Sequence, residues 1–320
     1  MKHRWPRLFC AFKDCWENSM KHLSRPELEN RLSELKAELG QEASRGLKLD
    51  MTRGKPSAEQ LDLSLPLLSL PGEQNFRSGD GTDLRNYGGL EGLPEARELM
   101  AALLDAPPAQ VIIGGNSSLQ LMHDALVRAL LFGLPGGRWQ APVRFLCPVP
   151  GYDRHFALCE ALGMEMLPVR LLETGPDMNQ VEDLVRDPAV KGIWCVPKYG
   201  NPTGCVYSDE VVERLSRMKT AAPDFRIFWD NAYALHHLNF PGASIQNILE
   251  TSERYGHADR PYVFASTSKI SFAGAGLSAM AASPANVKHA LKYMAFQTIG
   301  PDKINQWRHV QFFRDGAGMA

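Results

Sequence analysis

The chain has 320 residues, 44% of them hydrophobic and 22% charged, which is enough for one large domain or two smaller ones with a buried core. Its 35 lysines and arginines nearly balance 36 aspartates and glutamates, and the net charge of −1 argues against a nucleic-acid partner. No apolar run reaches the roughly 20 residues that a membrane span needs, which argues against a membrane protein. Six cysteines without a C-x-x-C pair favour reduced thiols, so we expect a globular protein of the cytoplasm.

The N-terminal region contains one clear helix signal. Residues 1–23 show no hydrophobic period, and we expect them to form a peripheral extension. Residues 24–27 (Ser-Arg-Pro-Glu) form a capping-box pattern with proline in the first turn, and leucines then recur at positions 28, 32, 35 and 39. This pattern predicts an amphipathic helix that ends near Gly40. Residues 47–87 are rich in Gly, Pro, Ser and Asp, which predicts a long loop of the functional kind.

From Gly88 onward, short apolar runs alternate with helical patterns. Helical spacing covers residues 119–131, 154–162 and 208–218. Continuous apolar runs that alternate with helices predict an α/β fold, a three-layer sandwich around a mainly parallel sheet. The six predicted strands cover residues 111–113, 144–147, 164–169, 192–196, 226–229 and 262–265.

Residues able to bind a ligand follow five of these strands, and ligands of open α/β sheets collect at the carboxyl ends of strands. Residues 114–118 (Gly-Gly-Asn-Ser-Ser) open a helix after the first strand, a pattern that suits a phosphate group. The other four strands are followed, in chain order, by an aromatic ring, an amide, a carboxylate with a phenol, and two serines with a lysine. Together these groups predict a pocket for a flat, phosphorylated ring that carries an aldehyde. They are Tyr152, Asn201, Asp230, Tyr233, Ser266, Ser268 and Lys269.

Several segments carry a resemblance to a known family. The chain resembles the fold-type I pyridoxal-phosphate aminotransferases and is most similar to the aspartate aminotransferases of subgroup Ic, over roughly residues 47–315. The resemblance implies a homodimer with a shared active site, acting on an amino acid (aspartate or glutamate) and a 2-oxo acid. The matching motifs are residues 52–57 (Thr-Arg-Gly-Lys-Pro-Ser), 86–92, 114–119, 201–204 (Asn-Pro-Thr-Gly), 230–233 and 266–276.

The resemblance implies a role for each matching residue. Lys269 would bond to the cofactor aldehyde and move a proton at the substrate Cα, and Asp230 would keep the pyridine nitrogen protonated. Tyr233 and Asn201 would bind the phenolic oxygen, and Tyr152 would stack on the ring. The groups implied to hold the phosphate are Gly115, Asn116, Ser117, Ser266, Ser268 and, from a second subunit, Tyr87. On the substrate side the resemblance implies Gly54 and Asn201.

Two departures from the family pattern matter. Many relatives carry an arginine for the phosphate where this chain has Leu277. The arginine that binds the substrate α-carboxylate normally lies in a C-terminal small domain, which we expect to be largely absent because the sequence stops at Ala320, and Arg53 is then our first candidate for that role. We expect residues 24–80 to supply the N-terminal helix and substrate-side loop, and residues 81–320 to form the large cofactor-binding domain.

Other functions stay open. Transamination of alanine or an aromatic amino acid is one alternative, and a catalytically silent, truncated remnant that still binds the cofactor is another. Two histidine patterns, His236-His237 and His155 with Cys159, could suggest a metal, but the sequence offers no third or fourth ligand and we predict no metal site. Residues 274–279 match a relaxed dinucleotide fingerprint but lie too far from the preceding strand to support that function.

Overall fold

The computed structural model describes residues 22–48 and 54–320. The chain divides into two compact units, Met1–Lys55 and Pro56–Ala320, which we describe separately. This division does not test the predicted boundaries after residues 23 and 80, which stay predictions. The predicted extension over residues 1–23 falls almost entirely outside the described part of the chain.

The described part of the first unit consists mainly of helix α2 (Arg25–Ser44). The predicted capping box is confirmed, because the carboxylate of Glu27 accepts the backbone N–H of Ser24 at 2.7 Å. The prediction that the helix ends near Gly40 was wrong: the helix continues for one more turn through this glycine. The leucine stripe is exposed, and α2 buries none of its residues within the described unit.

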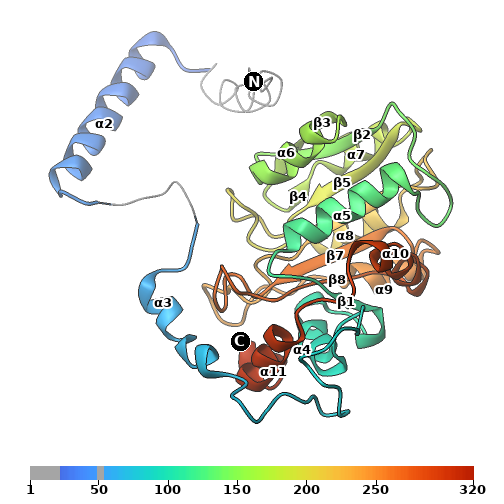
Figure 1. Ribbon diagram of the computed structural model, residues 1–320. Helices are drawn as coiled ribbons and strands as arrows, with labels where there is room; N and C mark the ends of the chain where they lie inside the picture. Colours follow the sequence, from blue (N-terminus) through green and yellow to red (C-terminus); the bar gives the residue numbers. More distant parts are fainter. Residues whose placement is uncertain (1–21, 49–53) are drawn as a thin grey trace. The chain divides into compact units, whose positions relative to one another are not determined.

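An eight-stranded sheet organises the second unit, in the order β1-β8-β7-β6-β5-β2-β3-β4 (Figure 1). The four pairings that join β3, β2, β5, β6 and β7 are parallel. Strand β8 runs antiparallel to both β7 and β1. The predicted α/β sandwich with a mainly parallel sheet is therefore confirmed. The strands are β1 (Val111–Ile113), β2 (Arg144–Val149), β3 (Glu165–Leu172), β4 (Gly175–Pro176), β5 (Val190–Cys195), β6 (Arg226–Asp230), β7 (Pro261–Ser266) and β8 (Ser278–Ala281).

Helices cover both faces of this sheet, and α5 crosses one face in the view of Figure 1. The helices of the second unit are α3 (Ala58–Asp62), α4 (Pro94–Leu104), α5 (Ser118–Leu131), α6 (Asp153–Ala161), α7 (Met178–Leu184), α8 (Asp209–Arg217), α9 (Ile248–Arg254), α10 (Pro284–Gln297), α11 (Lys303–Phe313) and α12 (Gly316–Met319), with 3-10 turns η1 (Leu65–Ser69) and η2 (Pro108–Gln110).

Alternation along the strands divides the core into two layers. In β6, Ile227 and Trp229 belong to the aliphatic cluster that also contains side chains of α4, α7, α8 and α9. Phe228 lies between them in the sequence and packs edge-on against Phe145 and Trp194 in an aromatic layer. Asp230, two residues beyond Phe228, therefore emerges on the aromatic side of the sheet, at its carboxyl end.

The structure bears on the predicted loop over residues 47–87, which is partly regular, and on the fingerprint match at residues 274–279. The loop predicted over residues 47–87 includes α3 and η1, and Leu67 of η1 is fully buried. Residues 274–279 lead into strand β8 and not into a helix, so they lack the strand-turn-helix context of a dinucleotide site. Among the described helices, none is long and apolar enough to cross a membrane.

Candidate active site

A pocket of about 180 Å³ lies at the carboxyl ends of the parallel strands. Eight of the residues predicted from the strand ends line it together, although they come from five separate segments of the chain. They are Ser117, Tyr152, Asn201, Asp230, Tyr233, Ser266, Ser268 and Lys269. The structure therefore supports the expectation that these segments form one site.

Asp230 lies on the floor of this pocket with only one of its oxygens paired. Its Oδ2 accepts a hydrogen bond from Nε2 of His155 at 3.0 Å, and both side chains are buried. Its Oδ1 is buried and has no partner among the described residues. A buried carboxylate oxygen without a partner is costly, which suggests that a ligand supplies the missing donor.

His155 is the site residue that the sequence did not reveal as such. Its ring stacks on Trp194, with centroids 4.3 Å apart and planes 6° apart, and the indole N–H of Trp194 donates to Cys159 Sγ at 3.2 Å. His155 and Cys159, suggested by their spacing as a metal pair, are therefore held by an aspartate and a tryptophan. The only available signal was that His155 follows Tyr152 by three residues and so shares its side of α6.

Tyr233, Asn201 and Lys269 line the same pocket as Asp230. The ammonium of Lys269 lies 4.8 Å from the centre of the Tyr233 ring. Burial, followed by the negative charge of Asp230, raises the pKa of Tyr233, and a side-chain hydrogen bond with Asn201 partly opposes that rise. Burial also raises the pKa of Tyr152, again with Asp230 as the next cause. Both phenols therefore stay protonated and can donate hydrogen bonds to an anionic oxygen.

The predicted phosphate cradle forms where β1 meets α5. Gly114 is closely packed, because a Cβ there would lie 2.8 Å from Ser278 Oγ and 2.9 Å from Leu121, and these side chains would have to shift. The hydroxyl of Ser266 donates to Ser268, whose own hydroxyl donates to the Asn116 carbonyl at 3.0 Å. These bonds join the two serines to the turn at the start of α5, whose first residues, Ser118 and Leu119, also line the pocket.

Leu277 occupies the position at which many relatives carry an arginine. It is fully buried. Its backbone N–H donates to the hydroxyl of Thr267 at 2.8 Å, and its carbonyl accepts the backbone N–H of Thr267 at 2.8 Å. The position therefore belongs to the core and offers no positive charge to the pocket.

Three predicted residues of the second unit do not line the pocket, and two further ones belong to the first unit. Gly115 and Asn116 lie in the turn before α5, where the Gly115 carbonyl accepts the Ser278 N–H at 2.8 Å. Tyr87 is 83% exposed on a loop between η1 and α4. Gly54 is exposed in the first unit, and Arg53 lies outside the described residues. The substrate-side roles of Gly54 and Arg53 stay predictions.

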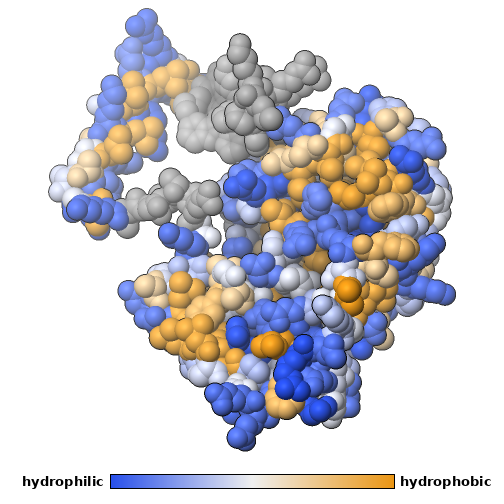
Figure 2. Space-filling view, in the orientation of Figure 1, coloured by the Kyte–Doolittle hydropathy of each residue, from blue (hydrophilic) through white to orange (hydrophobic). Residues whose placement is uncertain are grey.

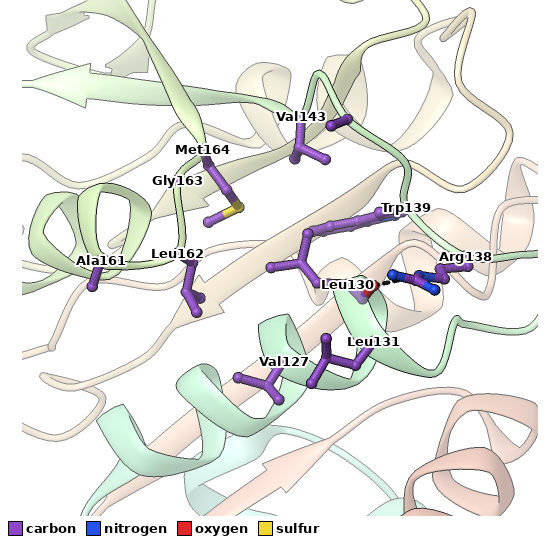
Figure 3. Close-up of a pocket in the computed structure, with 11 residues that line it drawn as sticks. Val127, Leu130, Leu131, Arg138, Trp139, Val143, Ala161, Leu162, Gly163 and Met164 are labelled. Atoms are coloured by element: carbon purple, nitrogen blue, oxygen red, sulfur yellow. Dashed lines mark hydrogen bonds between the residues drawn. The ribbon is translucent and has the colours of Figure 1, made fainter.

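A second pocket, of about 450 Å³, is larger but carries little chemistry (Figure 3). Its walls are the end of α5, the turn after α6 and the loop before β2, and Arg138 is its only charged residue. Arg138 donates to the Leu130 carbonyl at 2.6 Å, as the dashed line in Figure 3 marks. In neither pocket, nor elsewhere in the described chain, do three metal-binding side chains gather.

The layered sheet and the residues at its strand ends are those of an aminotransferase of fold type I. The family model described as aspartate amino-transferase matches residues 23–320. The chain belongs to the aspartate aminotransferase family.

Individual relatives agree with this assignment. An aspartate aminotransferase of Corynebacterium glutamicum is 46% identical over 302 residues, which span 93% of this chain and 68% of the relative. A protein of Mycolicibacterium smegmatis named as an aminotransferase is 52% identical over 305 residues, 93% of this chain and 70% of the relative. The crystal structure of an aspartate transaminase from C. glutamicum has a TM-score of 0.86 and 44% identity, covering 94% of this chain and 72% of the other. Membership of subgroup Ic stays a prediction.

Proposed function

We propose that this protein binds pyridoxal 5'-phosphate and transfers an amino group between aspartate or glutamate and a 2-oxo acid. The unpaired Oδ1 of Asp230 is the observation that carries the cofactor assignment. The pocket offers a buried carboxylate acceptor, phenol and amide donors, a lysine and a cradle for an anion. These groups fit the ring nitrogen, the phenolic oxygen, the aldehyde and the phosphate of this cofactor.

The bound cofactor would supply an aldehyde that captures amino groups and a protonated ring that accepts the electrons left at the substrate Cα. In this proposal, Asp230 keeps the proton on the ring nitrogen through a charge-assisted hydrogen bond, and His155 fixes the orientation of the carboxylate. Lys269 holds the cofactor aldehyde at rest and moves the proton at Cα during the reaction. Tyr233 and Asn201 donate hydrogen bonds to the phenolic oxygen, and Tyr152 covers the ring face.

We assign the phosphate to the turn before α5 and the serines after β7. Gly115, Asn116 and Ser117 offer backbone N–H groups at a helix N-terminus. Ser266 and Ser268 offer hydroxyls that are already connected to that turn. Since Leu277 is buried there, this cradle is less positive than one with an arginine, and we expect a correspondingly stronger dependence on the hydroxyl groups.

We propose a homodimer in which Tyr87 of one subunit completes the phosphate site of the other. The Tyr87 ring is exposed, but its loop is fixed, because the buried Lys303 donates to the carbonyls of Asn86 at 2.5 Å and Gly88 at 2.9 Å. Hydrophobic residues also gather in patches on the surface (Figure 2). Beside α5, Phe132 and Phe296 lie around one shallow pocket and are more than half exposed. Exposed apolar patches of this kind are typical of protein interfaces.

Subunit mixing tests the shared site. Lys269→Ala and Tyr87→Ala homodimers should each be nearly inactive, and a mixture after exchange should regain part of the wild-type rate, because a hybrid dimer contains one intact site. Sedimentation of each variant checks that the dimers form. An inactive mixture of exchanged dimers would remove Tyr87 from the partner's site.

Cofactor binding and substrate choice are tested by two spectroscopic measurements. Addition of pyridoxal phosphate should produce a visible absorption band, whose absence would refute the cofactor proposal. Addition of aspartate or glutamate should then bleach the band faster than alanine or phenylalanine does. A band that no amino acid changes would favour the silent cofactor-binding alternative, and the fastest amino acid would identify the substrate.

We also propose a cytoplasmic location. Among the described residues, Cys147, Cys159, Cys195 and Cys205 are buried free thiols. Burial raises the pKa of Cys195 and also that of Cys205, so both thiols stay protonated and unreactive. Such thiols are typical of a reducing compartment.

A further inference from the structure

The two adjacent histidines, His236 and His237, contact different loops of the active site. They follow Tyr233 closely in the segment between β6 and α9, and their side chains point to opposite neighbours. His236 reaches the loop that carries Lys269, and His237 reaches the loop that carries Asn201. No function has so far been assigned to either ring.

The contact of His236 is a hydrogen bond to the backbone next to the lysine. Its Nε2 lies 3.3 Å from the carbonyl oxygen of Lys269, and because that oxygen can only accept, Nε2 must carry the proton. Burial lowers the pKa of His236, and although the hydrogen bond to the Lys269 carbonyl partly opposes this, the ring stays neutral. The ring also packs edge-on against Tyr233, with centroids 5.6 Å apart. His236 therefore joins the lysine loop to the segment that carries Tyr233.

The contact of His237 is a hydrogen bond with the phenol of Tyr199. Nδ1 of His237 lies 2.7 Å from the Tyr199 hydroxyl, which also accepts the backbone N–H of Ala243 at 3.1 Å. Since that oxygen already accepts a bond, we assign its own proton to the bond with Nδ1.

The backbone on both sides of this bond is adapted to it. Tyr199 has a φ of 50°, a strained value for a residue with a side chain, and it comes two residues before Asn201. Gly242 packs so closely on His237 that an added Cβ would collide with the imidazole ring. The bond therefore fixes the start of the Asn201 loop relative to the segment that follows Tyr233.

We propose that His236 and His237 are positioning residues that together set the spacing between Lys269, Tyr233 and Asn201. Each histidine fixes one loop, and the rigid peptide between them fixes the two loops relative to each other. Neither ring lines the pocket, so neither is expected to touch the cofactor or the substrate. This inference rests on the proposed function only for its spectroscopic test.

The first test uses the protein without cofactor. Hydrogen exchange should become about 2- to 10-fold faster at the amides of Ile270 and Ser271 in His236→Phe, because the loop loses one hydrogen bond. In His237→Phe the increase should instead affect the amide of Gly200. The matched control is His257→Phe, which removes a comparable bond, Nδ1 to the Ser216 carbonyl at 3.0 Å, outside the site. It should leave all three amides unchanged.

Replacing each histidine by glutamine or asparagine makes the test more specific. Nε2 of histidine is as many bonds from Cβ as the amide nitrogen of glutamine, and Nδ1 corresponds to the amide atoms of asparagine. His236→Gln and His237→Asn should therefore restore slow exchange, whereas His236→Asn and His237→Gln should not. Tyr199→Phe, which keeps its ring, should reproduce His237→Phe and add no further effect to it.

The second test uses the cofactor-loaded protein. Loosening either loop weakens the donors to the phenolic oxygen, so the pH midpoint of the visible absorption band should rise by roughly 0.3–1 unit in each Phe variant and not in His257→Phe. If the wild type binds no cofactor, the proposed function fails while hydrogen exchange still decides the positioning role. The inference would be overturned if all three backbone amides exchanged at the wild-type rate in both Phe variants. It would also be overturned if His236→Asn and His237→Gln restored slow exchange as well as His236→Gln and His237→Asn do. An unshifted midpoint in both Phe variants of a protein that binds the cofactor would overturn it too.

Discussion

Replacing Asp230 by asparagine should change stability in opposite directions with and without cofactor. Asparagine has the same shape and keeps an oxygen for the N–H of His155, but it puts a neutral amide where the unpaired Oδ1 now lies. Without cofactor, the substitution removes a buried charge that is only half satisfied. With cofactor, it presents an N–H group to a ring nitrogen that itself carries a proton.

The expected magnitudes follow from these two changes. A buried polar group without a partner costs about 1–3 kcal/mol and a charged one more, so relief of part of that cost should stabilise the cofactor-free protein by about 1 kcal/mol. For a unit of this size that corresponds to a melting temperature about 2–4 °C higher. Loss of a charge-assisted hydrogen bond, about 1.5–3 kcal/mol, should weaken cofactor binding about 10- to 150-fold.

Calorimetry of both forms and a fluorescence titration with pyridoxal phosphate measure these effects. The control is Asp224→Asn, because Asp224 is also buried but is paired with a cation: its Oδ1 accepts from the ammonium of Lys191 at 2.7 Å. That variant should melt lower than the wild type and bind the cofactor normally. The reasoning fails if Asp230→Asn also melts lower without cofactor, or if its affinity stays within twofold of the wild type.

Three further predictions address the lysine, the surface charges and the sheet. Lys269→Ala should abolish the borohydride-trapped cofactor adduct. The control is Lys198→Ala, which should retain the adduct; Lys198 is half-buried, and burial lowers its pKa. An adduct in Lys269→Ala would exclude Lys269 as the residue that bonds to the cofactor. The hydrogen bond with Arg214 lowers the pKa of Glu182, so this pair stabilises the fold above the unfolded pKa of about 4.3 and the effect disappears as the pH falls through the lower folded value. In urea unfolding, Glu182→Gln should cost about 0.2–1 kcal/mol at pH 7 and progressively less as the pH falls below about 4.3, and a pH-independent loss would contradict this. Gly192→Ala should cost about 1–3 kcal/mol, since its Cβ would lie 2.9 Å from a backbone oxygen of the next strand, and an unchanged melting temperature would show that the sheet accommodates it.

The sequence was sufficient to predict six of the eight strands and most of the pocket. Each parallel strand is a short apolar run, and the side chains that follow such strands must lie at the same edge of the sheet. The alternation of apolar runs with helical patterns was therefore enough to place these side chains together. This is why Asp230, Tyr233 and Lys269 line one pocket although their positions in the chain are far apart.

The missed features depend on contacts between distant residues. His155 looks like any histidine on a helix until β6 brings Asp230 to within 3.0 Å of it. Strand β8 is four small or flexible residues, Ser-Ala-Met-Ala, without the β-branched run that marks a strand, and it exists because β1 and β7 flank it. Gly40 did not end α2, since propensity at one position is a weak signal within a long helix.

The pairing of β1 with β8 also determines when the site can form during synthesis. Strand β1 has one neighbour in the sheet, and that neighbour begins about 165 residues later in the chain. At ribosomal rates of about 5–20 residues per second, roughly 10–30 s pass before β8 emerges. Throughout that interval the three apolar residues of β1 lack their partner strand, and Gly114 lacks the backbone of Ser278 that it binds at 2.8 Å. The turn that we propose to hold the phosphate is therefore completed only after β8 has emerged, and a nascent chain stalled before β8 exposes a strand edge that chaperones would have to protect.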